Sequence, residues 1–319
     1  MRRLKNFSLF LSIASLISLA ACAGSNPDNA NTTATTTTTP PATQVLSVVP
    51  RPQAILDLMK QRGEQDQAKP VLKIISPAKD ATINGSTVAV KLDLAGDLKG
   101  YTPHKDPATG KGNHIHVILD NQPYEAYYEL GQPFELRNVV AGKHTLRVFP
   151  SRPWHESFKN EGAFQMVAFT VKGGGDAAKP TTTNTGQTVA NNKATPTASP
   201  QAALEGKDMP ASTGGDVDPA NPLLTYSRPK GEYKGPDADA IMIDFWLSNA
   251  KLKGDGGEHR VRYFIDNDEP RFIDKWEPVW LKGWTPGKHT VRLELLGADQ
   301  YPVQNGGYNI TTREITVVK

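Results

Sequence analysis

One stretch of the chain is written twice, and this repeat constrains the fold more than any other feature. The first copy, at residues 114–148, reads HIHVILDNQPYEAYYELGQPFELRNVVAGKHTLRV, and the second, at residues 260–293, reads RVRYFIDNDEPRFIDKWEPVWLKGWTPGKHTVRL. In each copy an alternating apolar run ends in an Asp-Asn turn, a second run follows, and Gly-Lys-His-Thr leads into a third. This order of signals is typical of consecutive antiparallel strands, so the sequence predicts two copies of one β-domain.

The repeat extends beyond these residues. A run with apolar side chains at every second position precedes each copy, at residues 88–94 and 241–247. About seven strands therefore fall within roughly 100 residues of the first domain, which favours an immunoglobulin-like sandwich over a barrel. The predicted fold class is all-β, with two immunoglobulin-like antiparallel β-sandwich domains joined by a disordered linker.

The first 21 residues have the pattern of an export signal. Three basic residues lie near the start, and residues 9–19 form an apolar core that is too short for a comfortable membrane span. The tetrapeptide LAAC at residues 19–22 follows, and it resembles the lipobox of bacterial lipoproteins. The resemblance implies cleavage before Cys22 and attachment of diacylglycerol to its sulfur. It also implies a location in the cell envelope with the lipid membrane as partner, and Ala23 after the cysteine favours the outer membrane.

Composition narrows the possible functions. Cys22 is the only cysteine, so the chain forms no internal disulfide and must be stabilised by its apolar cores. Without the leader, the chain has 33 basic and 33 acidic side chains. This balance gives no excess of positive charge of the kind that nucleic-acid binding requires. The sequence has no GxSxG, HExxH or phosphate-binding glycine loop. We therefore expect a protein that is not an enzyme.

Five segments are expected along the chain. Residues 1–21 are a lipoprotein signal peptide, and residues 22–69 hold the lipidated cysteine, a Thr/Pro-rich tether and a short helix at 52–63. The first immunoglobulin-like domain covers residues 70–172 and the second covers residues 223–319. Residues 173–222 are rich in Gly, Thr, Asn, Ala and Pro, so we expect a flexible linker there and two domains that fold independently.

Differences between the copies point to candidate metal ligands. The first copy has His114 and His116 on one strand face where the second has arginines, and an inserted loop adds His104. His155 lies in the loop between strands six and seven, which in this sandwich order meets the inserted loop at one end. These four imidazoles suit Zn or Cu. The alternative, which stays open, is that they are solvated polar residues on an exposed sheet face.

A second candidate site is a ligand surface built from aromatic and charged side chains. The loop at 151–162 is long and unusually rich in such residues, and we expect it to be the main recognition surface of the first domain. In the second domain one tryptophan falls on the outward face of its strand, where it is suited to stacking on a sugar or anchoring a partner. The proposed ligand-binding residues are Tyr101, Arg152, Trp154, His155, Glu156 and Trp246. The alternative for Trp154 is that it caps the open end of the sandwich.

His144 and His289 occupy the same Gly-Lys-His-Thr position in both copies. A residue shared by both copies belongs to the scaffold, so these two are expected to hydrogen-bond at a strand end and not to bind a ligand. Such GxHTL runs resemble those of bacterial immunoglobulin-like modules, and this resemblance implies a fold and no activity.

The combined interpretation is a membrane-anchored envelope lipoprotein that acts as a non-catalytic binding or assembly module and needs no cofactor. Two alternatives stay open. One is a periplasmic Cu- or Zn-binding protein that uses the histidines of the first domain. The other is a glycan-binding surface protein, and an envelope protein or a glycan is then the partner.

Replacing Cys22 with Ala tests the anchor. Because the lipid is attached through this sulfur, we expect the variant to accumulate as unprocessed or soluble protein when cells are fractionated. If these forms are no more abundant than in the wild type, the lipoprotein interpretation is wrong.

Overall fold

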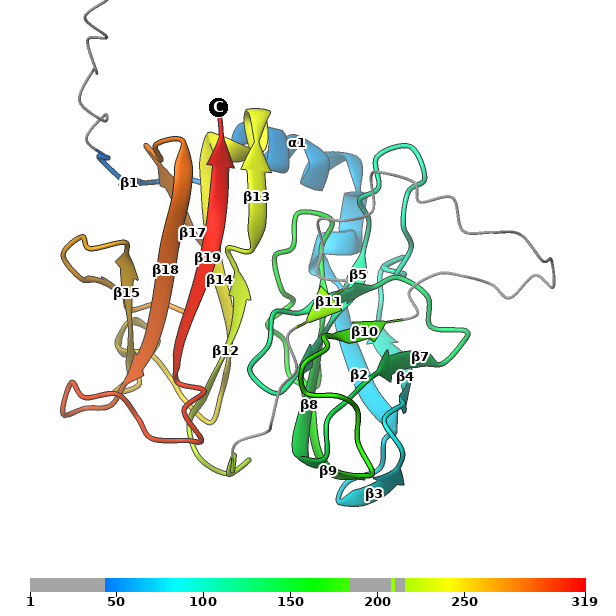
Figure 1. Ribbon diagram of the computed structural model, residues 1–319. Coiled ribbons are helices and arrows are strands. Elements are labelled where there is room, and N and C mark those ends of the chain that lie inside the picture. The colour runs from blue at the N-terminus through cyan, green and yellow to red at the C-terminus, as the bar shows by residue number, and fades with distance from the viewer. Residues whose placement is uncertain (1–43, 184–207, 210–215) are drawn as a thin grey trace, which may run out of the picture. The chain divides into compact units, whose positions relative to one another are not determined.

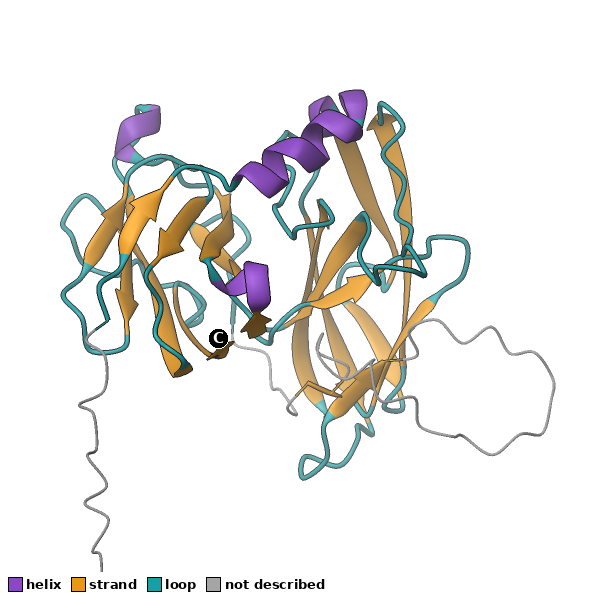
Figure 2. Cartoon of the chain, turned by 90° about the horizontal axis from the view of Figure 1, so that it is seen from above, coloured by secondary structure: helices purple, strands orange, loops and turns teal. Residues whose placement is uncertain are grey.

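The computed structural model describes residues 44–183, 208–209 and 216–319, and nearly all of its regular structure is β-strand (Figures 1 and 2). The leader, Cys22 and the Thr-rich tether lie outside these residues. The described helices are α1 (Gln53–Gln61) and three short 3-10 turns at Gly63–Gln67, Gly235–Ala238 and Lys253–Asp255. Within the described part of the chain, no helix has both the length and the apolar character needed to cross a bilayer.

Sandwich 1 is built from two facing sheets of five strands. Its strands are β2 (Lys69–Ser76), β3 (Ala81–Asn84), β4 (Val88–Asp97), β5 (His114–Leu119), β6 (Glu125–Tyr127), β7 (Phe134–Arg137), β8 (Gly142–Ser151), β9 (Gln165–Lys172), β10 (Thr181–Thr183) and β11 (Asp208–Met209). One sheet has the order β11-β10-β7-β4-β2 and the other β3-β9-β8-β5-β6. Apolar side chains from both sheets fill one core between them.

Sandwich 2 repeats this plan. Its strands are β12 (Leu223–Arg228), β13 (Gly231–Lys234), β14 (Ala240–Ser248), β15 (Arg260–Ile265), β16 (Arg271–Ile273), β17 (Val279–Lys282), β18 (Gly287–Leu296) and β19 (Ile310–Val318). They correspond in order to β2 through β9, and they form the sheets β17-β14-β12 and β13-β19-β18-β15-β16. The predicted all-β fold is therefore observed. The sequence did not predict β3 and β13, which pair in parallel with β9 and β19.

A strand from the start of the chain completes sandwich 2. β1 (Ser47–Val49) pairs antiparallel with β17, so it adds an edge strand in the place that β10 fills beside β7 in sandwich 1. The sequence predicts a tether with one helix at residues 22–69. It does not predict β1, because a three-residue strand gives no periodic signal. The helix itself is confirmed as α1, with Ile55 and Met59 against a buried cluster, whereas Leu56 is exposed.

The repeated Asp-Asn turn and Gly-Lys-His-Thr segment form the same hydrogen-bond network in both sandwiches. Asp120 has a φ of 51°, and its carboxylate accepts from the backbone amide of Thr145 at 2.9 Å and lies 2.9 Å from Nδ1 of His144. In sandwich 2, Asp266 has a φ of 53° and makes the same contacts to Thr290 and His289. The expectation that both histidines are strand-end hydrogen-bonding residues is confirmed.

The outer faces of the two sandwiches pack against each other. Every residue of β5 and every residue of β12 is buried, although alternate side chains of each strand point away from its own core. Across the contact, the Arg147 guanidinium donates to the Thr225 hydroxyl at 2.8 Å, and the Ser157 hydroxyl donates to the Asp244 carboxylate at 2.7 Å. The sequence predicts two domains that fold independently, whereas the structure shows this contact between them. The sequence does not reveal the contact, because polar residues at alternate positions of a strand are normally expected to face solvent.

Parts of the predicted linker at residues 173–222 are tied to the sandwiches. The Asn138 side chain donates to three backbone carbonyls, at residues 176, 179 and 180, before β10 joins β7. On the other side, Asn305 bonds to the backbone of Asp218. Residues 184–207 and 210–215 lie outside the described part of the chain.

The two histidine networks differ in burial, and this difference is testable. His144 and Asp120 are fully buried at their side chains, whereas Asp266 is one-third exposed. We expect His144→Ala to lower the free energy of unfolding by about 3–5 kcal/mol, because it leaves a buried carboxylate without its partner. His289→Ala is the matched control and should cost about 1 kcal/mol. Urea unfolding followed by circular dichroism measures both.

The cost of His144→Ala should also depend on pH. Burial lowers the pKa of His144, but the hydrogen bond and charge of Asp120 outweigh it, so the net pKa is raised. A raised folded-state pKa adds stability below the unfolded value of about 6.5 that is lost as pH rises through the folded value. The difference between wild type and His144→Ala should therefore be larger at acidic pH. Equal costs for the two variants at every pH would contradict this account.

Candidate metal centre

Strand β5 places two histidines side by side on the outer face of sandwich 1. Ile115, Val117 and Leu119 enter the core, so the alternation of the strand directs His114 and His116 to the opposite face. That face is covered by sandwich 2, and both imidazoles are completely buried. Their Nε2 atoms lie 2.9 Å apart.

The third histidine comes from the loop between β8 and β9. His155 has a φ of 69°, a left-handed conformation that is uncommon outside glycine. Its Nδ1 lies 3.0 Å from Nε2 of His114. The nitrogen donors of His114, His116 and His155 all lie within 4.8 Å of one another, so three imidazoles converge on one point.

Hydrogen bonds at the far side of the rings determine which nitrogens face the centre. Nδ1 of His114 lies 2.8 Å from the carbonyl oxygen of Gly112, which only accepts, so Nδ1 carries the proton and Nε2 presents a lone pair to the cluster. Nδ1 of His116 lies 3.1 Å from the hydroxyl of Ser227 in β12. The backbone passes so close to Gly112 that a Cβ there would collide with the backbone oxygen of His104, so the turn requires glycine.

Tyr124, just before β6, forms the wall of the cluster. Its ring stacks on His116 with centroids 3.6 Å apart, and its hydroxyl lies 3.1 Å from Nδ1 of His155. Sandwich 2 covers the other side of this ring with the Lys230 ammonium, 4.2 Å from the ring centroid. The phenol oxygen therefore borders the same space as the imidazole nitrogens.

The electrostatics keep His116 neutral. Burial, together with neighbouring His114 and His155, holds the pKa of His116 well below its usual value. A neutral imidazole is the form that binds a metal ion. His116 is therefore held in the form that can bind a metal ion.

The structure brings together three of the four predicted metal ligands. His104 is exposed and does not belong to the described cluster, although its backbone amide bonds to the carbonyl of Asn113 at the base of the inserted loop. The open alternative of solvated histidines on an exposed sheet face is wrong for His114 and His116, because sandwich 2 buries that face. Sequence reasoning missed Tyr124 and Ser227, which carry no histidine-like signal and come from other strands.

The predicted recognition loop is mostly an interior packing element. Trp154 is only 9% exposed, its Nε1 donates to the Glu156 carboxylate at 2.9 Å, and it packs with Met242 and Trp280 of sandwich 2. Glu156 is also buried and accepts from the Arg51 guanidinium at 2.9 Å. The prediction that this loop presents Trp154 and Glu156 to a ligand is therefore wrong, and Trp154 packs against sandwich 2 instead of capping the core of its own sandwich.

Three further predicted ligand-binding residues are used in packing. Tyr101 is fully buried, and its hydroxyl donates to the carbonyl oxygen of His114 at 2.9 Å. Arg152 donates to the Asp66 carboxylate at 3.0 Å. Trp246 is buried at the contact between the sandwiches, where it stacks with Phe164 at a centroid distance of 5.5 Å. The outward face of its strand, read from the sequence as exposed, is an internal interface.

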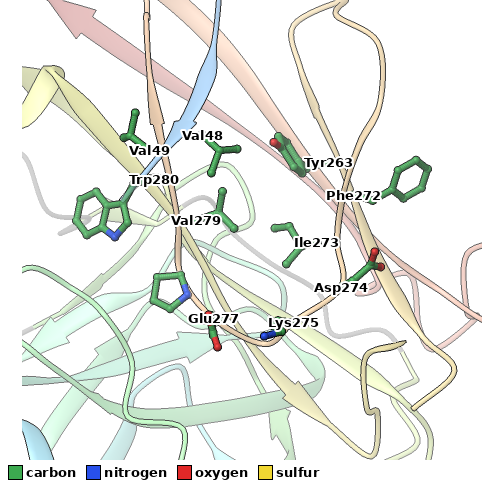
Figure 3. A pocket seen from close by; sticks show the side chains of 11 residues that line it. Val48, Val49, Tyr263, Phe272, Ile273, Asp274, Lys275, Glu277, Val279 and Trp280 are labelled. Carbon is green, nitrogen blue, oxygen red and sulfur yellow. The ribbon is translucent and has the colours of Figure 1, made fainter. Parts of the chain in front are cut away.

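Sandwich 2 also has an open groove with a volume of about 410 Å³ (Figure 3). It lies between β1 and β17 on one side and β16 on the other, and apolar side chains such as Phe272 and Val279 line it. Its Asp274 is paired with Arg260 at 2.6 Å. No histidine lines this groove, so it is separate from the imidazole cluster.

Comparisons with known proteins identify no family for this chain. No protein-family model matches the chain, and no characterised protein matches it in sequence. Among solved structures, the fibronectin(III)-like modules of Clostridium thermocellum CbhA are 10% identical, with a TM-score of 0.24 over 77% of this chain and 94% of that chain. The D00-D0 domain of intimin is 10% identical, with a TM-score of 0.21 over 79% of this chain and 100% of that chain.

A third similar structure is that of SGBP-B from the mixed-linkage glucan utilization locus of Bacteroides ovatus, in complex with a mixed-linkage heptasaccharide. It is 12% identical, with a TM-score of 0.18 over 78% of this chain and 70% of that chain. Likenesses this weak carry no argument about what the present chain binds. The evidence for a function therefore lies in the geometry of the histidine cluster.

The packing role of Trp154 is tested by Trp154→Ala. Removing a large buried ring should lower the free energy of unfolding by about 3–5 kcal/mol. Tyr301→Ala removes an aromatic ring that is 73% exposed and should change it by about 0.5 kcal/mol or less. Both are measured by urea unfolding of the full chain, and a Trp154→Ala variant as stable as Tyr301→Ala would overturn the packing assignment.

Proposed function

We propose that this protein is a lipid-anchored, non-catalytic protein of the cell envelope that binds a divalent transition metal ion, Zn²⁺ or Cu²⁺. One observation carries the proposal, namely the convergence of the nitrogen donors of His114, His116 and His155 within 4.8 Å. No other group of three or more potential metal-ligating side chains of this kind occurs in the described part of the chain.

The spacing of the donors supports a metal ion at their centre. Nitrogens bound tetrahedrally at about 2.0–2.1 Å from zinc lie about 3.3 Å from each other. Two of the observed separations, 2.9 and 3.0 Å, are a few tenths of an ångström shorter, and all three donors lie within 4.8 Å, so the rings must shift to make the separations equal around an ion. Imidazole nitrogen is a preferred ligand of both Zn²⁺ and Cu²⁺.

The frame around the donors supports a fixed site. His114 and His116 lie on a strand paired on both sides, by β6 and β8, and strands hold ligands more firmly than free loops do. The Tyr124 hydroxyl lies 3.1 Å from Nδ1 of His155, so an oxygen atom is also close to the cluster. Only His155 is partly exposed, which gives an ion a route to the cluster from solvent.

Binding, and not catalysis, is the activity that this frame supports best. His114 and His116 are completely buried, so a bulky substrate has no open approach to the donors through them. The aromatic residues expected to bind a glycan or a partner protein are used in internal packing. No observation therefore favours those two functions over metal binding.

Anchoring through Cys22 remains part of the proposal, supported by the LAAC tetrapeptide and the apolar leader before it. The metal site would then be presented at the membrane surface in the cell envelope. Two acyl chains on one cysteine bind a membrane far more firmly than one.

Metal titration of the full chain tests the proposal. We expect about one equivalent of Zn²⁺ or Cu²⁺ to bind, and a His114→Ala/His116→Ala variant to lose that binding because two of three ligands are gone. His104→Ala is the matched control, since this exposed histidine lies outside the cluster and its loss should leave affinity unchanged. Isothermal calorimetry measures all three proteins. Absence of binding by the wild type, or retention by the double variant, would refute the site.

A further inference from the structure

We propose that Ser227 of sandwich 2 is a positioning residue for the metal centre of sandwich 1, so that the site is complete only when the two sandwiches are docked. This inference rests on the proposed metal binding. It goes further by assigning a role to a residue 111 positions away in sequence, from a strand that supplies no metal ligand.

The contact is local and enclosed. Ser227 is 1% exposed, and its Oγ lies 3.1 Å from Nδ1 of His116. His116 itself is fully buried, with the Tyr124 ring against its face. Water is therefore a poor substitute for the serine hydroxyl at this nitrogen.

The alternation of β12 directs Ser227 toward sandwich 1, because Leu224 and Tyr226 enter the core of sandwich 2 and Thr225 faces Arg147. The register between β12 and β14 shifts between Tyr226 and Arg228, so Ser227 is the extra residue of the bulge. The equivalent shift in sandwich 1 falls between Ile74 and Ser76, and its extra residue, Ile75, is 43% exposed. The repeat therefore contains two bulges, and only that of sandwich 2 carries a hydroxyl directed at an imidazole.

The chemistry of the contact is that of an outer-sphere hydrogen bond. A metal-bound imidazole donates its other N–H to an oxygen acceptor, which fixes its tautomer and its ring orientation. With Nε2 of His116 facing the metal, Nδ1 carries the proton and donates to the Ser227 oxygen. The Gly112 carbonyl holds His114 in the same way from within sandwich 1.

The residues after Ser227 contact Tyr124, whose ring lies against His116. The Lys230 ammonium donates to the backbone oxygen of Tyr124 at 2.6 Å, and the Arg228 guanidinium lies 5.3 Å from the Tyr124 ring. Residues 227–230 therefore contact the cluster at the ring of His116 and at the segment that carries Tyr124. Separation of the sandwiches would remove all of these contacts together.

The test compares Ser227→Ala with Ser248→Ala and Ser227→Thr in the full chain. Ser248 lies on β14 in the same sheet, and its buried hydroxyl has no hydrogen-bond partner among the described residues, which makes it a matched control. Zn²⁺ affinity is measured by competition with a chromophoric chelator, and Co²⁺ loaded in place of zinc reports ligand geometry through its visible absorption. Circular dichroism and a thermal melt establish that each variant is folded.

We expect Ser227→Ala to weaken Zn²⁺ binding by about 10- to 100-fold and to alter the Co²⁺ absorption bands. Ser248→Ala should match the wild type, and Ser227→Thr, which keeps the hydroxyl, should restore most of the affinity. If the wild type binds one equivalent and Ser227→Ala binds within about twofold of it, the role of Ser227 is refuted while the metal site stands. If the wild type binds no metal, the proposed function itself fails and this inference fails with it.

Discussion

Burial of one sheet on both of its faces determines most of what is distinctive in this protein. The sheet β3-β9-β8-β5-β6 packs one face into the core of sandwich 1 and gives much of the other to sandwich 2. Polar side chains on that second face must find partners in the protein, because an unpaired buried polar group is costly. Arg147 illustrates this constraint, since it is 1% exposed, donates to Thr225 and lies over the Tyr308 ring. Burial lowers the pKa of this arginine to about 10.

The same constraint accounts for the different side chains at equivalent positions of β5 and β15. At the positions of His114 and His116, sandwich 2 has Arg260 and Arg262, which pair with Asp274 and Glu294. The outer face of β15 is partly exposed, and there long cations can reach both carboxylates and water. On the buried face of β5, His114 and His116 are completely enclosed, and burial holds the pKa of His116 well below its usual value.

Much of the fold could be read from the sequence, because its signals are local. The alternating runs predicted β4, β5, β14 and β15, and the duplicated Asp-Asn and Gly-Lys-His-Thr segments predicted a shared scaffold. The histidine cluster could be anticipated in part, since His114 and His116 are two residues apart and His155 lies in a loop at the same end. The role of Ser227 could not be predicted, because it depends on docking of the second sandwich against the first. The burial of Trp154 and Trp246 also depends on the contact between the sandwiches, so the sequence predicts both side chains as exposed.

The pairing of β1 with β17 has a consequence for the order of folding. β1 (Ser47–Val49) belongs to the first part of the chain to be synthesised, yet its partner begins at Val279, about 230 residues later. Contacts between such distant segments form late, because a long loop must be closed before they stabilise anything. A chain emerging from a ribosome can therefore complete the core of sandwich 1 while this edge of sandwich 2 is still open. The segment that precedes sandwich 1 must then stay unpaired until residues 279–282 have been made.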